Sequence, residues 1–339
     1  MTEKFLSEAL NQVIESLYFR QKGSGKMLTG FLGIGIGFGL ATQTAINSQL
    51  RKFVVSPFLA SFISFLVGTV FLAIATFMSG SRLGIPLSMF TSQPVWIWFG
   101  GICGVIFLTT NILLFPKLGS VQTTVMPILG MIVMGMLIDH FGWFHSIKQP
   151  FEWSRIFGVF FVLLGVILAV VLQEVILNRR ESASLKHNHL NQWIWRVAGI
   201  GAGMLVAIQA AINGQLGVVL ESPFQSSFIS FFIGSLTLLI VVVIKERKFT
   251  NMKEPIKQSA PWWVWIGGLI GGLYVLINVY LVGQIGTGQT VVLALFGQIA
   301  GSLIVQQFGL FKSIKNSIAF IQILGLMIML VGVFLIKMV

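Results

Sequence analysis

The chain has 339 residues, of which 55% are hydrophobic and only 9% are charged. Soluble domains carry about 25% charged residues, so this composition excludes a soluble globular protein and indicates an integral membrane protein. The net charge of +12 does not indicate nucleic-acid binding, because the basic residues lie in short segments between apolar runs and form no basic reading module. We expect them to orient membrane spans and to contact anionic lipid headgroups.

The first 26 residues have acidic residues where a cleavable signal peptide would have a basic start. Apolar residues at positions 5, 6, 9, 10, 13, 14 and 17 recur at helical spacing. This pattern predicts an amphipathic helix on the membrane surface, and a partly ordered cytosolic tail stays open as the alternative.

Ten apolar runs follow, and each has about the 20 residues that a helix needs to cross the bilayer. They begin near Leu28, Pro57, Val95, Val121, Ile156, Ile194, Pro223, Trp262, Thr290 and Ser317. We therefore predict an all-α integral membrane protein with ten transmembrane helices. The predicted organisation is an N-terminal segment (1–26), a first five-span repeat (27–177), a polar linker (178–193) and a second five-span repeat (194–339).

The two halves of the chain repeat each other. Residues 33–68 align with 199–234 without a gap and share more than half of their residues, including "QTAINSQL" and "QAAINGQL". After one inserted residue the register holds to the end, so that Gly100 aligns with Gly267. Because each copy has an odd number of spans, the chain must enter the second copy from the opposite side of the membrane. We predict two inverted repeats, an architecture of many secondary transporters, with a substrate path where the halves meet.

The motifs in each copy are a Gly-rich first span, "QxxIN(S/G)QL", "SPF…SFISF" and "GG…G…N", followed by a Ser-Val-Gln-Thr or Gly-X-Gln-Thr segment. Together they resemble the YdcZ-like branch of the drug/metabolite transporter superfamily, in its ten-span fused form. The resemblance covers nearly all of the chain after about residue 28. It implies a multi-pass protein of the bacterial inner membrane that exports small molecules, without indicating which ones. The implied partners are a small-molecule substrate and the lipid bilayer, no cofactor is implied, and a homodimer stays open.

Amide side chains inside the spans are the main candidates for a substrate path. Gln43 and Asn47 share a helix face, and Gln209 and Asn213 repeat the pair in the second copy. An unpartnered amide is costly in hydrocarbon, so these side chains must face protein or a watery cavity. They either line the path or tie one helix to its neighbour. The full set of candidates is Gln43, Asn47, Asn111, Gln122, Gln209, Asn213, Asn278, Gln289, Gln298 and Ser302.

Positions that differ between the copies are candidates for recognising an asymmetric substrate. A stripe on the fourth span comprises Thr123, Pro127, Met131, Gly135 and Asp139, and its partners on the ninth span are Thr290, Ala294, Gln298, Ser302 and Gln306. The ninth-span stripe is polar in mid-membrane, which favours contact with cavity water or substrate. The alternative is that these positions have drifted and that Gln298 pairs with a neighbouring helix.

No acidic residue lies in the middle of a span, so exchange of a cationic drug for protons through a central carboxylate is not favoured. Coupling through Asp139 and His140, facilitated diffusion and coupling by the substrate's own proton stay open. An enzyme is not expected, because the chain has neither an HExxH motif nor a nucleophile constellation; no metal site is expected either. The rival to a transporter is a non-transporting membrane scaffold or assembly partner. Loop charges conflict between the copies about orientation, and we expect cytoplasmic termini.

Overall fold

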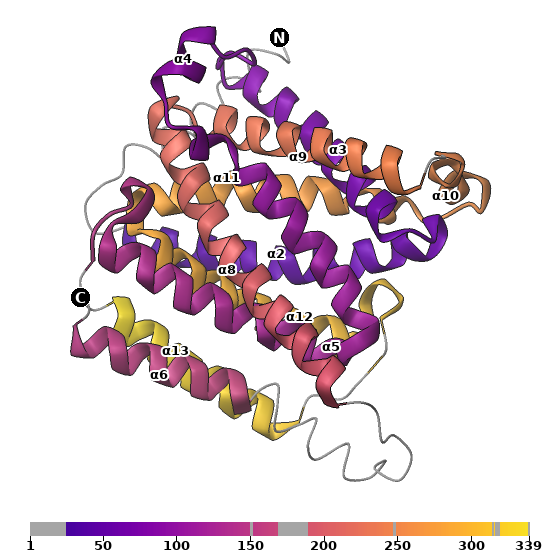
Figure 1. Ribbon diagram of the computed structural model, residues 1–339. Helices are drawn as coiled ribbons and strands as arrows, with labels where there is room; N and C mark the ends of the chain where they lie inside the picture. Colours follow the sequence, from indigo (N-terminus) through magenta and orange to yellow (C-terminus); the bar gives the residue numbers. More distant parts are fainter. Residues whose placement is uncertain are drawn as a thin grey trace, which may run out of the picture.

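The computed structural model describes residues 25–149, 152–168, 189–246, 249–313, 315 and 319–337, with the backbone alone at 25–26, 87, 112, 115–125, 166, 189–192, 250, 333 and 337. This part of the chain is helical (Figure 1). Its α-helices are α2 (Gly25–Val54), α3 (Pro57–Met78), α4 (Leu87–Ser92), α5 (Gly100–Phe141), α6 (Trp153–Val166), α8 (His189–Val219), α9 (Pro223–Lys245), α10 (Glu254–Lys257), α11 (Gly267–Ile285), α12 (Thr287–Phe308) and α13 (Phe320–Lys337). Short 3-10 helices are η1 (Val95–Trp98), η2 (Trp143–His145), η4 (Thr250–Lys253), η5 (Trp262–Trp265) and η6 (Leu310–Lys312).

Among the described residues, six helical segments are long and apolar enough to cross a membrane: Met27–Val54, Pro57–Met78, Trp193–Val219, Pro223–Lys245, Trp262–Ile285 and Thr287–Phe308. Four shorter apolar segments are Gly100–Asn111, Met126–Phe141, Trp153–Gly165 and Phe320–Ile336. The prediction of an all-helical membrane protein is confirmed for this part of the chain, whereas the count of ten spans stays a prediction.

A single helix, α5, covers the third and fourth predicted spans, but the chain reverses direction within it, because Trp96 just before α5 packs on Phe144 just after it, with 5.2 Å between ring centroids. In the second copy, the corresponding helices α11 and α12 are divided at Gly286, whose φ of +82° suits a residue without a Cβ. The N-terminal segment 1–24 and residues 178–188 of the predicted linker lie outside the described residues, and α8 already begins at His189.

The helices form a layered bundle in which equivalent helices of the two copies pair at both edges (Figure 1). At one edge α3 packs against α9, and at the other α6 packs against α13. Between these edges, α2 packs on α12 and α11 of the second copy, while α8 packs on α5 of the first. Each copy therefore builds its core mainly from contacts with the other copy.

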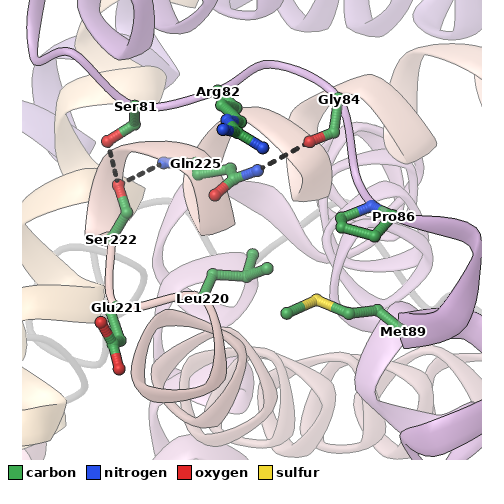
Figure 2. A pocket seen from close by; sticks show the side chains of 9 residues that line it. All are labelled: Ser81, Arg82, Gly84, Pro86, Met89, Leu220, Glu221, Ser222 and Gln225. Carbon is green, nitrogen blue, oxygen red and sulfur yellow. Dashed lines mark hydrogen bonds between the residues drawn. The ribbon is translucent and has the colours of Figure 1, made fainter.

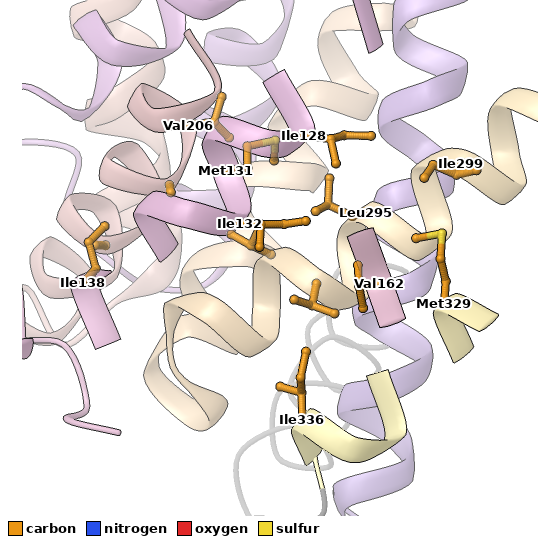
Figure 3. Close-up of a cluster of buried hydrophobic side chains, with 14 of the residues drawn as sticks. Ile128, Met131, Ile132, Ile138, Val162, Val206, Leu295, Ile299, Met329 and Ile336 are labelled. Carbon is orange, nitrogen blue, oxygen red and sulfur yellow. The ribbon is translucent and has the colours of Figure 1, made fainter. Parts of the chain in front are cut away.

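The main apolar core lies on the side of the bundle that α6 and α13 cover. Figure 3 shows side chains of α5, α6, α8, α12 and α13 that meet there, including Ile132, Val162, Leu295 and Met329. A second core, on the side of α3 and α9, includes Leu59, Leu72, Leu238 and Val279. The interhelical packing of these two cores holds α2, α5, α8, α11 and α12 in register between them.

Glycines let the central helices cross closely, as small residues do in membrane bundles. A Cβ at Gly37 of α2 would collide with the backbone carbonyl of Ala294 on α12. A Cβ at Gly203 of α8 would collide in the same way with the carbonyl of Pro127 on α5. The two crossings are equivalent, because Gly37 aligns with Gly203 and Ala294 with Pro127.

Connections between helices gather at two ends of the bundle. At the first, which we call the Asp139 end, Ser81 contacts Ser222 (Oγ–Oγ 2.9 Å) and the Trp96 ring packs on Phe144, with 5.2 Å between centroids. The second is named the Lys312 end. There Gln49 Nε2 donates to the Lys312 carbonyl at 3.3 Å, and Asn251 Nδ2 donates to the Val54 carbonyl at 3.3 Å. The Ser56 hydroxyl also donates to Glu246 at this end.

Candidate functional site

The amide pair of α2 lies directly on a glycine pair of α11. Asn47 packs on Gly267 and Gln43 packs on Gly271, so closely that a Cβ at either glycine would collide with the amide. Asn47 Nδ2 also donates to Ser64 Oγ of α3 at 3.2 Å. The spacing of four residues in each pair brings both contacts onto one face of each helix. The two amides therefore lie where α2, α3 and α11 meet.

The second copy repeats this contact with the partners exchanged. Asn213 of α8 packs on Gly100 of α5, and Gln209 packs on Gly104. In both copies, the "QxxxN" motif of one repeat meets the "GGxxG" motif of the other. Sequence reasoning noted the two motifs separately and missed that they contact each other. The sequence signal was the spacing of four residues in both motifs, because two residues four apart lie on one helix face and contact a packed neighbour at a similar spacing.

Several polar atoms in this region lack a hydrogen-bond partner in the described part of the chain. They are Asn47 Oδ1, Asn213 Oδ1, Asn111 Oδ1, Asn278 Nδ2 and Gln298 Oε1. The Asn47, Asn213 and Asn278 side chains are almost fully buried. A buried amide without a partner is costly, and the unpaired atoms keep these side chains as candidates for the substrate path.

The other predicted candidates fall in different surroundings. Gln289 Nε2 donates to Gln149 Oε1 at 3.4 Å, near the start of α12. Ser302 donates to the Ile299 carbonyl of its own helix at 2.8 Å. Gln298 is half-buried on α12 beside the crossing with α2 at Gly37. The Gln122 side chain lies outside the described residues. The structure thus places Gln43 and Asn47 on α11, places Gln209 and Asn213 on α5, and gives Ser302 and Gln289 local partners.

Asp139, at the end of α5, is the most constrained charged residue in the described chain. Its side chain is fully buried and accepts hydrogen bonds from the backbone amides of Thr287 (3.1 Å) and Gly288 (2.8 Å). Arg155 of α6, also buried, donates from Nη2 to Asp139 at 3.3 Å and from Nη1 to the Gln149 carbonyl at 3.0 Å. The carboxylate thus neutralises both the guanidinium and the positive end of the α12 dipole.

Arg155 is a residue of this site that sequence reasoning missed, because it lies 16 positions after Asp139 and beyond a turn. The sequence feature that could have identified Arg155 is that it aligns with a glutamine, Gln322, in the second copy, just as Asp139 aligns with Gln306. The ring of His140, the other coupling candidate, lies edge-on to Phe141 with 4.8 Å between centroids.

A separate pocket of about 310 Å³ opens at the Asp139 end of the bundle (Figure 2). Its wall joins the connection after α3 to the turn between α8 and α9. Gln225 Nε2 donates to the Gly84 carbonyl at 3.2 Å, and Ser222 caps α9 by accepting from the Gln225 amide at 3.2 Å. Arg82 and Glu221 are exposed at its rim. The residues that line the pocket do not include the amides in the middle of the bundle.

Comparisons with known proteins give two findings that agree with this architecture. A family model described as "Putative inner membrane exporter, YdcZ" matches the chain twice, over residues 28–168 and 194–335. A protein of solved structure, titled only "Crystal structure of protein", superposes with a TM-score of 0.62 at 12% identity, covering 94% of this chain and 98% of that one. At that identity, the likeness shows the fold alone. No curated protein matches the chain.

The two family matches fall one on each copy and together cover most of the chain. They confirm the resemblance drawn from the motifs, and they agree with the apolar helices in making this a multi-pass protein of the inner membrane. The family is one of membrane exporters and not of enzymes. The chain belongs to the YdcZ family of inner membrane exporters, of which it carries two copies in tandem.

Proposed function

We propose that this membrane transporter moves a small polar or amphiphilic molecule outward by alternating access between two inverted five-span repeats. The substrate candidates are the amides that lie between the repeats, with Gln298 as the side chain that distinguishes one copy from the other. The family supports an exporter, and it does not favour the rival proposal of a non-transporting scaffold.

The reciprocal seating of amides on glycines is the observation that carries the proposal. Asn47 contacts Gly267 while Asn213 contacts Gly100, so each contact has an equivalent with the two copies exchanged. Contacts exchanged in this way are those of two bodies related by a twofold axis. Two such bodies can rock against each other, and rocking of this kind opens a path alternately to each side.

The arrangement of the connections supports the inverted relation of the repeats. The connection after α3 of the first copy lies at the Asp139 end, where Ser81 contacts Ser222. The equivalent connection after α9 lies at the Lys312 end, where Asn251 contacts Val54. Equivalent segments at opposite ends of the bundle are expected of inverted repeats and not of parallel ones.

The test is a comparison of metabolites inside and outside cells with and without the gene, followed by flux of each compound that changes. Purified protein in lipid vesicles should then move that compound across the bilayer. Vesicles with a variant that still folds but carries leucine at position 298 are the control. If no compound changes in the cells and none crosses the vesicle membrane, the proposal of a carrier fails.

A further inference from the structure

The contacts of Asp139 form a closed unit that joins three helices at one end of the bundle. The acid lies at the end of α5, its guanidinium partner Arg155 on the first turn of α6, and its two amide donors, Thr287 and Gly288, on the first turn of α12. Ser146 Oγ also lies 3.3 Å from Thr287 Oγ1, and Gln149 Nε2 donates to the Ile285 carbonyl at 3.3 Å. This unit fastens the start of α12 to the first copy.

Glycine at position 288 is a necessary part of this unit. A Cβ at Gly288 would lie 2.6 Å from Asp139 Oδ2, which is too close for the carboxylate to reach the backbone amide. The acid, the arginine and the glycine are therefore one arrangement, because loss of any of them removes or displaces the others' contacts.

None of the three components recurs at the equivalent position of the other copy. Gln306 stands where the first copy has Asp139, Gln322 where it has Arg155, and Val121 where the second copy has Gly288. The alignment is secure here, because "FGWFHSIK" from Phe141 matches "FGLFKSIK" from Phe308. Gln322 uses its side chain to cap its own helix, accepting from the Ala319 amide at 2.9 Å.

We propose that Asp139, Arg155 and Gly288 form a one-sided latch that holds the Asp139 end of the carrier closed. The Lys312 end has no equivalent ion pair among the described residues, so the two ends differ in the free energy needed to open them. The resting carrier therefore favours the conformation in which the Asp139 end is shut. This inference builds on the proposed alternating access, and the three residues position helices without touching the substrate.

The energetic argument rests on what opening would expose. Separation of α12 from α5 breaks two hydrogen bonds to a carboxylate and leaves a buried ion pair without part of its support. Hydrogen bonds to charged groups contribute more than neutral ones, and an uncompensated buried charge is strongly unfavourable. The Lys312 end has no buried ion pair among the described residues; its contacts include a neutral bond from Gln49 to the Lys312 carbonyl and a part-buried bond from Ser56 to Glu246.

The experiment measures opening directly by the labelling rate of a buried cysteine. In a Cys103→Ser background, Val291→Cys places a thiol one turn inside α12, where Val291 lies against Gly135 of α5 and is 1% exposed. A second reporter, Val54→Cys, is buried at the Lys312 end. Each is reacted with a small membrane-permeant thiol reagent in lipid vesicles, and the rate is compared with and without the latch.

Replacing the ion pair by the residues of the other copy, Asp139→Gln with Arg155→Gln, should raise the Val291→Cys rate by at least about tenfold. The same change should leave the Val54→Cys rate unchanged or lower. The matched control, Gln306→Ala with Gln322→Ala, should not alter the Val291→Cys rate. A purely structural role would lower thermal stability and raise both reporters' rates together.

If the double glutamine variant does not fold, Gly288→Ala tests the latch through an uncharged position and should also raise the Val291→Cys rate. The latch proposal is wrong if the Val291→Cys labelling rate is unchanged in a well-folded latch variant, or if the control variant raises that rate equally. Labelling does not depend on the substrate. If the latch variants change labelling but no compound is transported, the latch proposal is supported and the carrier proposal is wrong. If a compound is transported but the latch variants do not change labelling, the carrier proposal is supported and the latch proposal is wrong.

Discussion

The two copies are alike in the amide–glycine contacts between them and unlike in the charged residues at their helix ends. Asn47 on Gly267, near the Lys312 end, and Asn213 on Gly100, near the Asp139 end, are the same contact made twice. At the ends, a buried Asp139–Arg155 pair in the first copy stands where the second has two glutamines. The difference teaches that the contact surface between repeats is restricted by close packing, whereas the ends are free to diverge. Divergence there can give an otherwise symmetric molecule two unequal faces.

The first prediction concerns the opposed directions of the copies and has an all-or-none outcome. In a Cys103→Ser background, Arg82→Cys and Lys253→Cys place single exposed thiols after α3 and after α9. An impermeant thiol reagent added outside intact cells should label one and spare the other, because inverted repeats place these two connections on opposite sides of the membrane. Labelling of both cysteines from the same side would show that the repeats are not inverted.

The second prediction concerns the helix crossings that the two copies share. Gly37→Leu should prevent folding or lower stability by several times the roughly 1–3 kcal/mol of ordinary overpacking, because the added side chain meets the Ala294 carbonyl. Gly203→Leu should act alike in the second copy. The matched controls are Gly35→Leu and Gly201→Leu, whose added atoms meet open space. Thermal unfolding in detergent, followed by size-exclusion chromatography, checks each pair.

The third prediction concerns Gln298 of α12, which aligns with Met131 in the first copy. Gln298→Leu should lower transport at least about tenfold, because one hydrogen bond to a bound solute is worth about that factor when its partner is left unpaired. Asn278→Leu should behave alike. Both proteins should still insert and elute as folded protein. Ser227→Ala, which loses only a bond to the Pro223 carbonyl of its own helix, should transport nearly normally. Normal flux with leucine at 298 would locate the binding site elsewhere.

The smallest expected effect is at the helix caps, where the copies are again alike. Ser56 accepts from the Leu59 amide and Ser222 from the Gln225 amide, both at 3.2 Å. Ser56→Ala and Ser222→Ala should each lower the free energy of unfolding by about 1 kcal/mol. A much larger loss at Ser56 alone would show that its contact with Glu246, which Ser222 lacks, dominates over the cap.

Much of the fold could be predicted from the chain because the bilayer restricts it so strongly. Apolar runs of about 20 residues must be helices in hydrocarbon, and a register shared between halves must reflect a repeated structure. The separation of the third and fourth spans was less predictable. Gly119 aligns with Gly286, where α11 and α12 are divided, whereas α5 continues past Gly119 although the chain turns back within it; the surrounding helices decide how each glycine is used.

The candidate site was predicted by residue type and not by partner. Buried amides follow from the cost of polar groups in hydrocarbon, so Gln43 and Asn47 could be named from their place in an apolar run. That they lie on the Gly267 and Gly271 backbone could not, because the partner is more than 200 residues away in the chain. Asp139 was recognised as a candidate, but Arg155 was not, since an ion pair across a turn leaves no periodic pattern.

The sequence alone determined the membrane class, the repeat and the residues that each copy retains, because these depend on local composition and on spacing along one helix. The tertiary structure decided which motif contacts which, where α12 is fastened and which end carries the ion pair. These depend on long-range contacts between helices of different copies. Such contacts are set by the close approach that glycines permit and by the burial of Asp139 at a helix start, and neither is encoded at any single position.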